Sequence, residues 1–407
     1  MSLAAAIKMR GWCPGSLRPM PSGDGLLARV RPWCGAFSLD EARGLADLAE
    51  RLGNGHIDFT RRANLQIRGV REERVGDLQA ALAAFGLLDR DAQIEAGRNI
   101  MVGPLAGIDP VERLDVRPIA RTLVRLLASD AALHDLPSKF AFLVDGGGRV
   151  SIAGERADVS LRAAGSAIAV GIGAEWIGST SLDNAARVAV EAARAFLGIA
   201  RNCNRVRELP ADRFAELRSA MLAMLRPFDG GLPSVSTRPL GVLALGAEKV
   251  AVGIAAPFGR IEAQQLHRLV AILDKAGASD IRLSPWRTLY VEARDRVTAC
   301  MLVEAADAIG LVVDDANPIL RIDACPGAPA CRSSSVDTRD LAVLLARRKF
   351  DRTIHISGCA KGCARSEPAE LVLVGEHGRY GVVRNGTARS MPERIVDAGQ
   401  ARALLDV

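Results

Sequence analysis

The same succession of secondary-structure elements occurs twice in the sequence, and this duplication constrains the fold more than any other feature. In the first half, residues 26–31 predict a strand, and Ser38-Leu39-Asp40-Glu41 predicts a capping box that begins a helix. Apolar residues then recur at helical spacing until Gly53 or Gly55. Two short strands and another helix follow, at 57–60, 65–69 and 73–85. The same order returns in the second half, at 249–256, 261–273, 281–284, 289–292 and 295–309.

The two copies can be matched over most of their length. We match Phe37 with Phe258, Leu65 with Leu289, residues 98–104 with 320–326, and residues 136–142 with the segment that leads to 356–358. Each half is therefore predicted to be a βαββα unit followed by a second α/β module, which gives a duplicated α+β fold with mixed α/β character. The predicted segments are 1–90, 91–205, an Arg- and Pro-rich linker at 206–238, then 239–315 and 316–407.

A run of three glycines, Gly146-Gly147-Gly148, follows a predicted strand at 140–144. The run predicts a hairpin turn, with residues 149–152 as the returning strand. The sequence has no G-x-G-x-x-G pattern at a strand-to-helix junction, so we expect no nicotinamide-binding domain. Electrons for a redox reaction are then expected to come from a separate protein.

Four of the eight cysteines form two tight pairs near the C-terminus, and only the second copy carries them. Cys325 and Cys331 have the spacing C-x5-C, and Cys359 and Cys363 have the spacing C-x3-C. An iron–sulfur cluster needs four thiolates from well-separated backbone segments, which two such loops supply. Structural zinc is the competing interpretation, but zinc usually takes C-x2-C to C-x4-C loops. The pattern therefore favours a 4Fe–4S cluster.

Composition narrows the class of protein. The N-terminus has too short an apolar stretch for a secretory signal, and no apolar run reaches the length of about 18 residues that a membrane span needs. We therefore expect a cytoplasmic protein without a membrane partner, in which disulfides are unusual. Of the scattered cysteines, Cys203 and Cys300 are expected to be small buried residues, and the roles of Cys13 and Cys34 are left open.

The formal net charge is +6, and arginine supplies most of the positive charge. The excess of arginine reflects either codon usage or the recognition of carboxylates, which a guanidinium group binds through two parallel hydrogen bonds. The basic residues are dispersed and aromatic residues make up only 4% of the chain, so we expect no nucleic-acid partner.

The duplicated architecture, with C-x5-C followed by C-x3-C, resembles the sirohaem-dependent sulfite and nitrite reductases over nearly the whole chain. That resemblance implies two ferredoxin-like half-domains and two larger modules, with Cys363 as the ligand that also bridges to the sirohaem iron. Residues 60–66, TRRANLQ, resemble the T-x-R-x-x-x-Q strand of the family, Arg98-Asn99 its second arginine site, and residues 136–140, LPSKF, its LPRKFK segment. The matches imply anion-binding or tetrapyrrole-binding roles for Arg62, Arg98 and Lys139. The alternative roles are ordinary salt bridges for the arginines and a solvated charge for the lysine.

Two departures weaken the interpretation as a reductase. The second lysine position of the LPRKFK segment is Ala141, which cannot deliver protons to an anionic oxygen. The loop from Cys359 to Cys363 also lacks the Asn that the reductases usually carry between their cysteines. A closer match is the precorrin-3B synthase branch, which residues 10–26 and 57–69 resemble.

The closer resemblance implies an oxygen-dependent monooxygenase of cobalamin biosynthesis. Its substrate is precorrin-3A, a metal-free polyanionic tetrapyrrole that is hydroxylated with O2 while an acetate side chain closes a lactone. In this chain Arg62 and Arg98 are then expected to bind substrate carboxylates, and Lys139 to contact substrate or take part in catalysis. The 4Fe–4S cluster would pass electrons from an external donor, an NADH- or NADPH-linked reductase or a ferredoxin. An additional non-haem iron is implied as well, although the sequence shows no clear triad of two His and one carboxylate. The alternatives are a sirohaem-dependent ferredoxin sulfite or nitrite reductase and a non-catalytic tetrapyrrole-binding protein.

Overall fold

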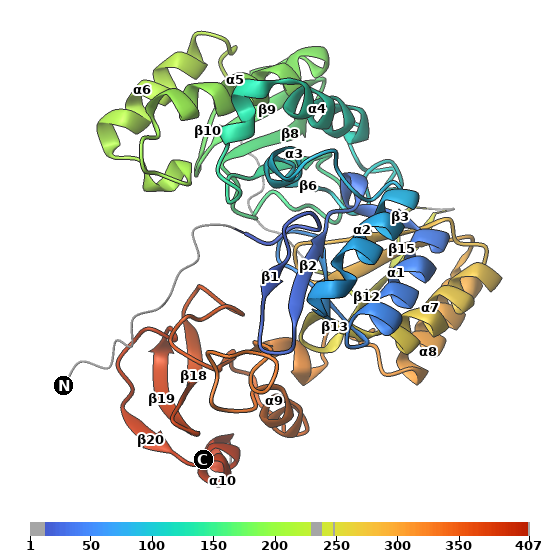
Figure 1. Ribbon diagram of the computed structural model, residues 1–407. Helices are drawn as coiled ribbons and strands as arrows, with labels where there is room; N and C mark the ends of the chain where they lie inside the picture. Colours follow the sequence, from blue (N-terminus) through green and yellow to red (C-terminus); the bar gives the residue numbers. More distant parts are fainter. Residues whose placement is uncertain (1–12, 229–237, 247–248, 406–407) are drawn as a thin grey trace.

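The computed structural model describes residues 13–228, 238–246 and 249–405. Within these residues the strands form four sheets of five strands each. Two of the sheets lie side by side in a central unit, and each of the other two belongs to a separate module, one on either side of that unit (Figure 1). The predicted α+β class and the duplicated architecture are confirmed.

The central unit contains both half-domains, and each half-domain lends one strand to the sheet of the other. Strand β13 of the second copy pairs with β4 of the first, and β3 of the first copy pairs with β14 of the second, both antiparallel. In order, the first sheet holds β1 (Met20–Pro21), β2 (Leu26–Val30), β5 (Leu65–Val70), β4 (His56–Phe59) and β13 (Arg260–Glu262). The second sheet holds β11 (Gly241–Ala244), β12 (Val250–Ala255), β15 (Thr288–Ala293), β14 (Asp280–Leu283) and β3 (Ala36–Ser38).

Helices cover these two sheets and share one hydrophobic core with them. They are α1 (Leu39–Leu52), α2 (Val75–Ala84), α7 (Ala263–Lys275) and α8 (Arg296–Ala308). Helix α1 packs against α7, so apolar residues of both copies meet in a single cluster. Ser38 and Glu262, which begin α1 and α7, form capping boxes at equivalent places, and the box predicted at Ser38 is confirmed. The half-domains are therefore one folding unit, although they are distant in sequence.

The two outer modules repeat one sheet topology. In the repeat-1 module the order is β10 (Glu175–Thr180), β9 (Ala167–Ile172), β8 (Val159–Ala164), β7 (Phe142–Asp145) and β6 (Ile100–Val102). In the repeat-2 module it is β20 (Arg394–Val396), β19 (Arg379–Gly386), β18 (Ala369–Glu376), β17 (Ile354–Ser357) and β16 (Ile322–Ala324). The helices are α3 (Ala92–Gly97), α4 (Arg117–Ser129), α5 (Leu182–Ile199) and α6 (Ala211–Leu222) in the first module, and α9 (Arg339–Ala346) and α10 (Ala398–Arg402) in the second. No helix in the described ranges is long and apolar enough to cross a membrane.

Three expectations from the sequence need correction. The segment expected to be a linker at 206–238 begins with α6, whose Leu217 and Met221 are buried in the core of the repeat-1 module, and its residues 229–237 lie outside the described part. Residues 146–148 do not turn a hairpin. After them the chain crosses over to β8, which pairs parallel with β7. The glycine run therefore lies in a loop at the carboxyl end of a parallel strand.

Strand register corrects part of the match between the copies. Leu65 lies opposite Phe59, and Leu289 lies opposite Leu283 in the corresponding strand pair, which confirms the match of Leu65 with Leu289. Phe37 does not correspond to Phe258. The residue with left-handed backbone before the exchanged strand is Cys34 (φ 53°) in the first copy and Phe258 (φ 56°) in the second, so Phe258 corresponds to Cys34 and Phe37 to Ile261. Similar side chains at nearby positions had suggested the wrong register.

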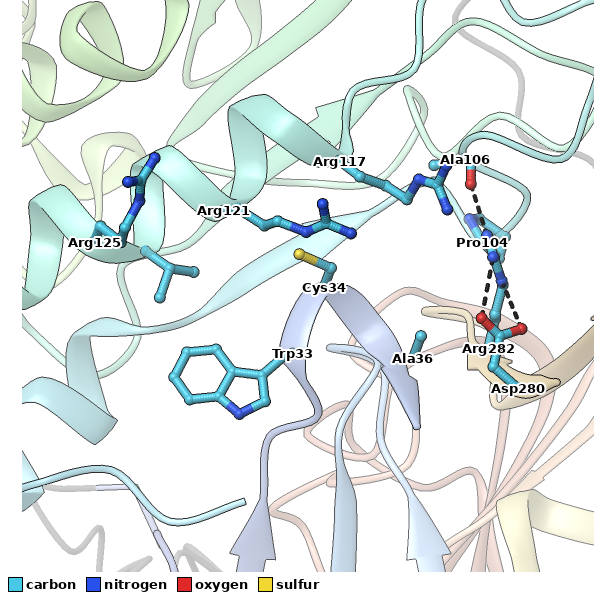
Figure 2. A pocket seen from close by; sticks show the side chains of 12 residues that line it. Trp33, Cys34, Ala36, Pro104, Ala106, Arg117, Arg121, Arg125, Asp280 and Arg282 are labelled. Carbon is cyan, nitrogen blue, oxygen red and sulfur yellow. Dashed lines mark hydrogen bonds and ion pairs between the residues drawn. The ribbon is translucent and has the colours of Figure 1, made fainter. Parts of the chain in front are cut away.

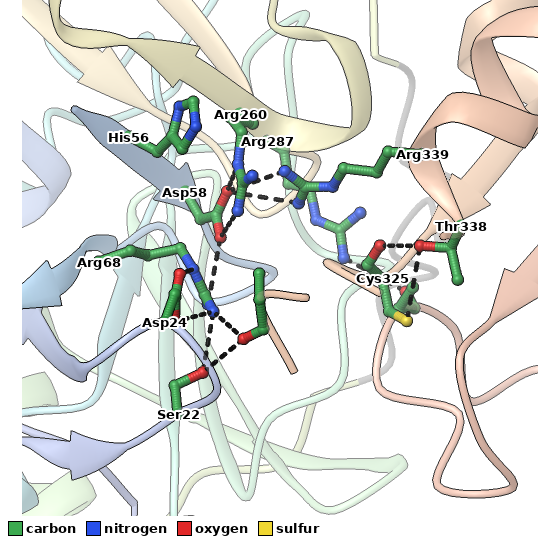
Figure 3. Close-up of polar contacts among 12 residues, drawn as sticks. Ser22, Asp24, His56, Asp58, Arg68, Arg260, Arg287, Cys325, Thr338 and Arg339 are labelled. Carbon is green, nitrogen blue, oxygen red and sulfur yellow. Dashed lines mark hydrogen bonds and ion pairs between the residues drawn. The ribbon is translucent and has the colours of Figure 1, made fainter. Parts of the chain in front are cut away.

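Asp58 on β4 connects three parts of the molecule (Figure 3). Its carboxylate accepts from Arg260 Nε at 2.7 Å, and it lies 3.5 Å from Arg68 Nη1 and 3.3 Å from Arg339 Nη2 at the start of α9. Burial would raise the pKa of Asp58, but Arg339, Arg260 and Arg68 more than offset it and hold the pKa well below its usual range. The exchanged strand and the repeat-2 module are thus tied to one buried carboxylate.

Replacing Asp58 by Asn should therefore destabilise the fold strongly. The substitution leaves three guanidinium groups facing a neutral side chain, and breaking a buried ion pair costs about 3–5 kcal/mol. Urea unfolding measures the loss. Because the folded-state pKa is depressed, the contribution is present at pH above the ordinary aspartate value of about 3.9 and is lost as pH falls below it, so the difference between D58N and wild type should shrink in acid. Asp40→Asn, at an exposed pair with Arg43, is the control and should cost less than about 1 kcal/mol. Equal losses in the two variants would contradict the assignment.

Candidate functional site

The two cysteine pairs lie on loops that leave neighbouring parallel strands. Cys325 follows β16 directly, and Cys359 follows β17 after Gly358. Strands β16 and β17 pair in parallel, so both loops emerge from the same edge of the sheet, as loops at carboxyl ends do. The predicted convergence of the two pairs therefore follows from the sheet topology.

The four thiols are close enough to influence one another's ionisation. Burial raises the pKa of Cys359, and the nearby Cys331 and Cys325 raise it further, against a lowering effect of the Lys361 backbone N–H. Burial raises the pKa of Cys363 to about 11, where Lys361 lowers it and the other three cysteines raise it. The backbone N–H of Gly358 donates to Cys325 Sγ at 3.1 Å. Amide donors to thiolate sulfur are a usual feature of iron–sulfur sites, so this donor set fits the group.

Within the described residues, no three His, Cys, Asp or Glu side chains are placed to hold one metal ion. A structural zinc site requires such a set around a single ion. In a 4Fe–4S cluster each thiolate binds a different iron atom, so the sulfur atoms need not meet at one point. The 4Fe–4S cluster stays a prediction, and the additional non-haem iron has no assigned ligands among the described residues.

Contacts from the central unit hold the first cysteine loop. The carbonyl of Ala330, next to Cys331, accepts from the Gly23 N–H at 3.1 Å, from Ser22 Oγ at 2.9 Å and from Arg68 Nη2 at 3.0 Å (Figure 3). In the same loop the Thr338 hydroxyl donates to the Cys325 carbonyl at 2.5 Å. The N-terminal hairpin therefore fixes the backbone on which two of the cysteines lie.

A second buried carboxylate, Asp323 on β16, lies two positions before Cys325. It pairs with Arg61 at 3.0 Å, Arg365 at 3.1 Å and Arg287 at 3.5 Å, which come from three different segments. Burial raises the pKa of Asp323, and the three arginines outweigh burial and lower it overall. Arg287 also donates to the Ala364 carbonyl, beside Cys363. No sequence pattern pointed to Asp323 or Arg287, because the residues that each of them contacts lie far away in the chain.

Arg62 lies in the turn between β4 and β5, with its guanidinium group directed to the repeat-1 module. The Thr60 hydroxyl accepts from the Arg62 N–H at 3.2 Å and shapes the turn, and Arg62 Nη1 donates to the Arg156 carbonyl at 2.7 Å. Burial lowers the pKa of Arg62 to about 10, and Arg205 lowers it further. Among the described residues no carboxylate forms an ion pair with Arg62. A half-buried guanidinium group that forms no direct ion pair is suited to bind an anionic ligand.

Arg98 and Lys139 lie in different surroundings. Arg98 is buried, pairs with Asp89 at 2.7 Å, donates to the Arg31 carbonyl at 2.8 Å and stacks 3.9 Å from the Trp33 ring centroid. A substrate carboxylate would have to displace Asp89, so the geometry gives Arg98 the role of a structural ion pair. Lys139 is exposed and makes no hydrogen bond or ion pair with the described residues, and its predicted role stays a prediction.

The remaining candidate residues are placed as follows. Cys203 is half-buried, whereas Cys300 is exposed, so the expectation of a buried Cys300 is wrong. His355 on β17 is fully buried, and burial lowers its pKa to about 4, which leaves the ring neutral at neutral pH.

Beside Asp323 a small pocket of about 110 Å³ is lined by Arg61, Arg287, Trp286 and others. Trp286 Nε1 donates to Glu155 of the repeat-1 module at 2.7 Å, so the pocket lies close to the surroundings of Arg62.

The first copy keeps the loops of the cysteine site without its thiols. The loop from β6 to α4 is as long as the loop from β16 to α9, and paired residues of β7 and β8 are as far apart in the sequence as paired residues of β17 and β18. The positions of Cys325, Cys331, Cys359 and Cys363 are taken by Gly103, Asp109, Gly147 and Ser151. Ser151 Oγ donates to Asp145 at 2.8 Å, and the Arg149 N–H donates to Asp109 at 2.5 Å. In these loops of the first copy, the carboxylates of Asp145 and Asp109 therefore accept hydrogen bonds from a hydroxyl group and from a backbone N–H group.

Comparison with known proteins supports the duplicated fold and the family resemblance. Residues 18–85 and 245–292 match the family model described as the nitrite/sulfite reductase ferredoxin-like half domain. A precorrin-3B synthase from a Sinorhizobium species is 34% identical over 404 residues, which cover 95% of this chain and 85% of that protein. A ferredoxin–nitrite reductase from Synechococcus elongatus is 25% identical, with 88% and 77% covered. The solved structure of the Mycobacterium tuberculosis NirA protein is similar with a TM-score of 0.76 at 21% identity, covering 94% of this chain and 79% of that chain, which shows a shared fold.

Gly358 should tolerate no side chain. A Cβ atom at this position would lie 2.1 Å from Ser334 Oγ and 3.5 Å from Cys325 Sγ, so Gly358→Ala forces the two cysteine loops apart. We expect a loss of about 1–3 kcal/mol in the free energy of unfolding, measured in urea, together with a lower iron content. Gly76→Ala in helix α2, where a Cβ atom meets nothing within 4 Å, is the control and should be neutral or stabilising. A G358A protein with wild-type stability and iron content would refute the expectation.

Proposed function

The chain belongs to the precorrin-3B synthase family, within the nitrite and sulfite reductase superfamily, and is an oxidoreductase; from this premise we propose that it hydroxylates precorrin-3A with O2 and forms the lactone. The observation that carries the proposal is that four thiols lie near one another at one edge of a sheet, in a molecule that also has a half-buried arginine without an ion-pair partner among the described residues. The first feature suits a redox cluster, and the second suits an acidic substrate.

Cys325, Cys331, Cys359 and Cys363 would hold the 4Fe–4S cluster, which supplies electrons one at a time when bound. The chain contributes the surroundings. Gly358 offers its N–H to one sulfur, the N-terminal hairpin fixes the Cys331 loop, and Asp323 holds the strand that leads to Cys325. Such outer contacts set the orientation of the ligands and the potential of the group. The additional non-haem iron stays an expectation, and we derive no step from it.

Substrate binding is assigned to arginine. Arg62 would bind a carboxylate of the macrocycle, because its guanidinium group is half-buried and forms no ion pair with the described residues, although Asp158 and Glu155 lie near enough to raise its pKa. Arg205 and Arg207 lie close enough to lower its pKa, so a bound anion would relieve repulsion among these cations. Lys139 would contact substrate from its exposed position, and Arg98 would act indirectly, by holding Trp33 and Asp89 in place.

The electron donor would be a ferredoxin or an NADH- or NADPH-linked reductase. O2 would be the second substrate, and cofactor chemistry of this kind needs external electrons to reduce the remaining oxygen atom to water. A sirohaem-dependent sulfite or nitrite reductase stays the alternative in the same superfamily. Ala141, at the position of the second family lysine, is fully buried, and its N–H donates to Asp158 at 2.9 Å. The Cβ atom of a lysine at this position would lie in the hydrophobic core. Its side chain would therefore be poorly placed to deliver the protons that a reductase requires.

Serine substitutions test the cluster. Cys325→Ser, Cys331→Ser, Cys359→Ser and Cys363→Ser, each purified without oxygen, should contain less iron and acid-labile sulfide than wild type and should lose the broad brown absorbance. Cys300→Ser, which changes an exposed cysteine, should retain all three. Wild-type protein that binds neither iron nor sulfide would refute the assignment. A strong Soret band in the wild-type spectrum would instead indicate sirohaem and the reductase.

Substitution of Arg62 tests substrate binding. Oxygen uptake by the cluster-loaded protein, with precorrin-3A and a reductant, gives KM and kcat. A charge-assisted hydrogen bond contributes about 1.5–3 kcal/mol, so Arg62→Ala should raise KM roughly tenfold to a hundredfold. Arg62→Lys should recover only part of the loss, because lysine cannot form the two parallel bonds. Arg51→Ala on the exposed end of α1 is the control and should leave KM unchanged. An Arg62→Ala variant with wild-type KM would remove this residue from the site.

A further inference from the structure

One pocket in the molecule lies away from the cysteine loops. It has a volume of about 510 Å³ and lies between the turn before β3, the end of β14, the loop after β6 and one face of α4 (Figure 2). Its lining includes Trp33, Cys34, Arg117, Arg121, Arg125 and Arg282. No role in the proposed reaction accounts for this pocket.

Several lining positions differ between the two copies, and two of these differences bear directly on the pocket. The equivalent space in the second copy is filled by the Asp58 network (Figure 3). By strand register Arg260 corresponds to Ala36, which removes a long side chain, and Asp58 corresponds to Arg282, which reverses a charge. Arg339 at the start of α9, which pairs with Asp58, corresponds to Arg117 at the start of α4. The first copy thus keeps a cationic group at this place and lacks the carboxylate that its counterpart has.

Helix α4 presents a row of three arginines to the pocket, and only the first of them pairs with a carboxylate. Arg117, Arg121 and Arg125 are one turn apart on one face, as Figure 2 shows, and the helix contains no acidic residue. Eight residues of helix span about 12 Å, which is the length of the row at the backbone. Like charges four residues apart destabilise a helix, and cations are unfavourable near its N-terminus. The three arginines therefore lower the stability of α4 in two ways, and an anion bound beside them would offset both effects.

Two of the cations that line the pocket are partly neutralised and two are not. Arg117 pairs with Asp115 at 2.8 Å, and Arg282 pairs with Asp280 at 3.1 Å. Arg121 forms no hydrogen bond or ion pair with the described residues, and Arg125 reaches only the Thr122 hydroxyl, at 3.1 Å. The free positive charge is therefore concentrated on the outer part of the row, at Arg121 and Arg125.

The rest of the lining is apolar and firmly held. Ala36, Pro104 and Val124 line the pocket beside Trp33, whose side chain is partly exposed. Trp33 Nε1 donates to the Gly86 carbonyl at 2.7 Å, and the Arg98 guanidinium group stacks on the ring. The indole is thus fixed before any ligand arrives, as in pockets that recognise flat apolar groups.

We propose that this pocket binds a small organic polycarboxylate with a flat apolar body. The body would lie against Trp33 and the apolar wall, and separate carboxylates would pair with Arg121 and Arg125. Spaced carboxylates fit the row better than a polyphosphate, whose charges are concentrated within a few bonds. An inorganic anion would leave the apolar wall unused. The proposal concerns a second site and is independent of the cluster and of the reaction at the cysteine loops.

Pyrenetetracarboxylate, a fluorescent planar compound with carboxylates on its rim, is a suitable probe. It is titrated into the full-length protein as purified with its cofactor, and binding is followed by fluorescence anisotropy. Saturable binding is expected, and Arg121→Glu and Arg125→Glu should each weaken it about tenfold or more. Arg187→Glu is the matched control, since Arg187 is exposed on the neighbouring helix α5, forms no ion pair among the described residues, and gives the same change in charge.

Competition tests the chemical class of the ligand. ATP carries phosphates and citrate carries carboxylates without an apolar body, so both should displace the probe less well than benzenetetracarboxylate, a flat aromatic tetracarboxylate without pyrene fluorescence. Binding that persists unchanged in Arg121→Glu and Arg125→Glu, or that falls equally in Arg187→Glu, would overturn the proposed site. Tighter binding of ATP, or equal binding of citrate, would overturn the proposed ligand class. Loss of iron and sulfide in the wild-type protein would contradict only the cluster assignment, so the two failures are distinguishable.

Discussion

The exchange of strands β3 and β13 between the half-domains is the constraint on which the rest of the structure depends. Each borrowed strand completes the sheet of the other copy, and the two copies then share one hydrophobic core. Neither half-domain can be removed without leaving an unpaired sheet edge and exposed apolar residues in the other. Because the exchange is reciprocal, it places both outer modules against equivalent faces of the central unit. The cysteine loops and the 510 Å³ pocket are consequences of the same geometry, one in each copy.

The duplicated frame allows one set of loops to serve two purposes. In the second copy four thiols occupy the loops at the carboxyl ends of β16 and β17. In the first copy the corresponding loops hold Asp109 and Glu112, and β7 ends at Asp145; these carboxylates accept from nearby backbone N–H groups. Burial raises the pKa of Glu112 to about 7, so this carboxylate remains partly protonated near neutral pH. The first copy thus has a polar network at the loops where the second copy has four thiols.

The parts of the fold that were predictable from sequence are those with local signals. Alternating and helical apolar patterns located β2, α1, β4 and β5, and the capping box at Ser38 marked the start of α1 correctly. The register of the copies was found at Leu65 but missed at Phe37, because two phenylalanines lay near equivalent turns. The carboxylates Asp58 and Asp323 were invisible for another reason. Each gathers arginines from three distant segments, and no spacing within the chain encodes such a meeting. Arg98 resembled a ligand-binding residue by motif, with an ordinary salt bridge as the alternative, and the sequence did not identify Asp89 as the partner.

The candidate functional residues of this molecule lie at equivalent positions where the two copies carry different residues. Arg62 occupies the turn position that Trp286 holds in the second copy, with the same hydroxyl-capped backbone from Thr60 and Ser284. Where the copies agree, as at the glycines before β3 and β13, the residues maintain the frame. Where they differ, the difference is in charge or in metal-binding capacity, as at Asp58 and Arg282 or at Cys325 and Gly103. A frame fixed by strand exchange tolerates such differences, because both copies contribute to one shared hydrophobic core. An internal comparison of the copies therefore identifies candidate sites in a single sequence, once strand register has set the correct correspondence.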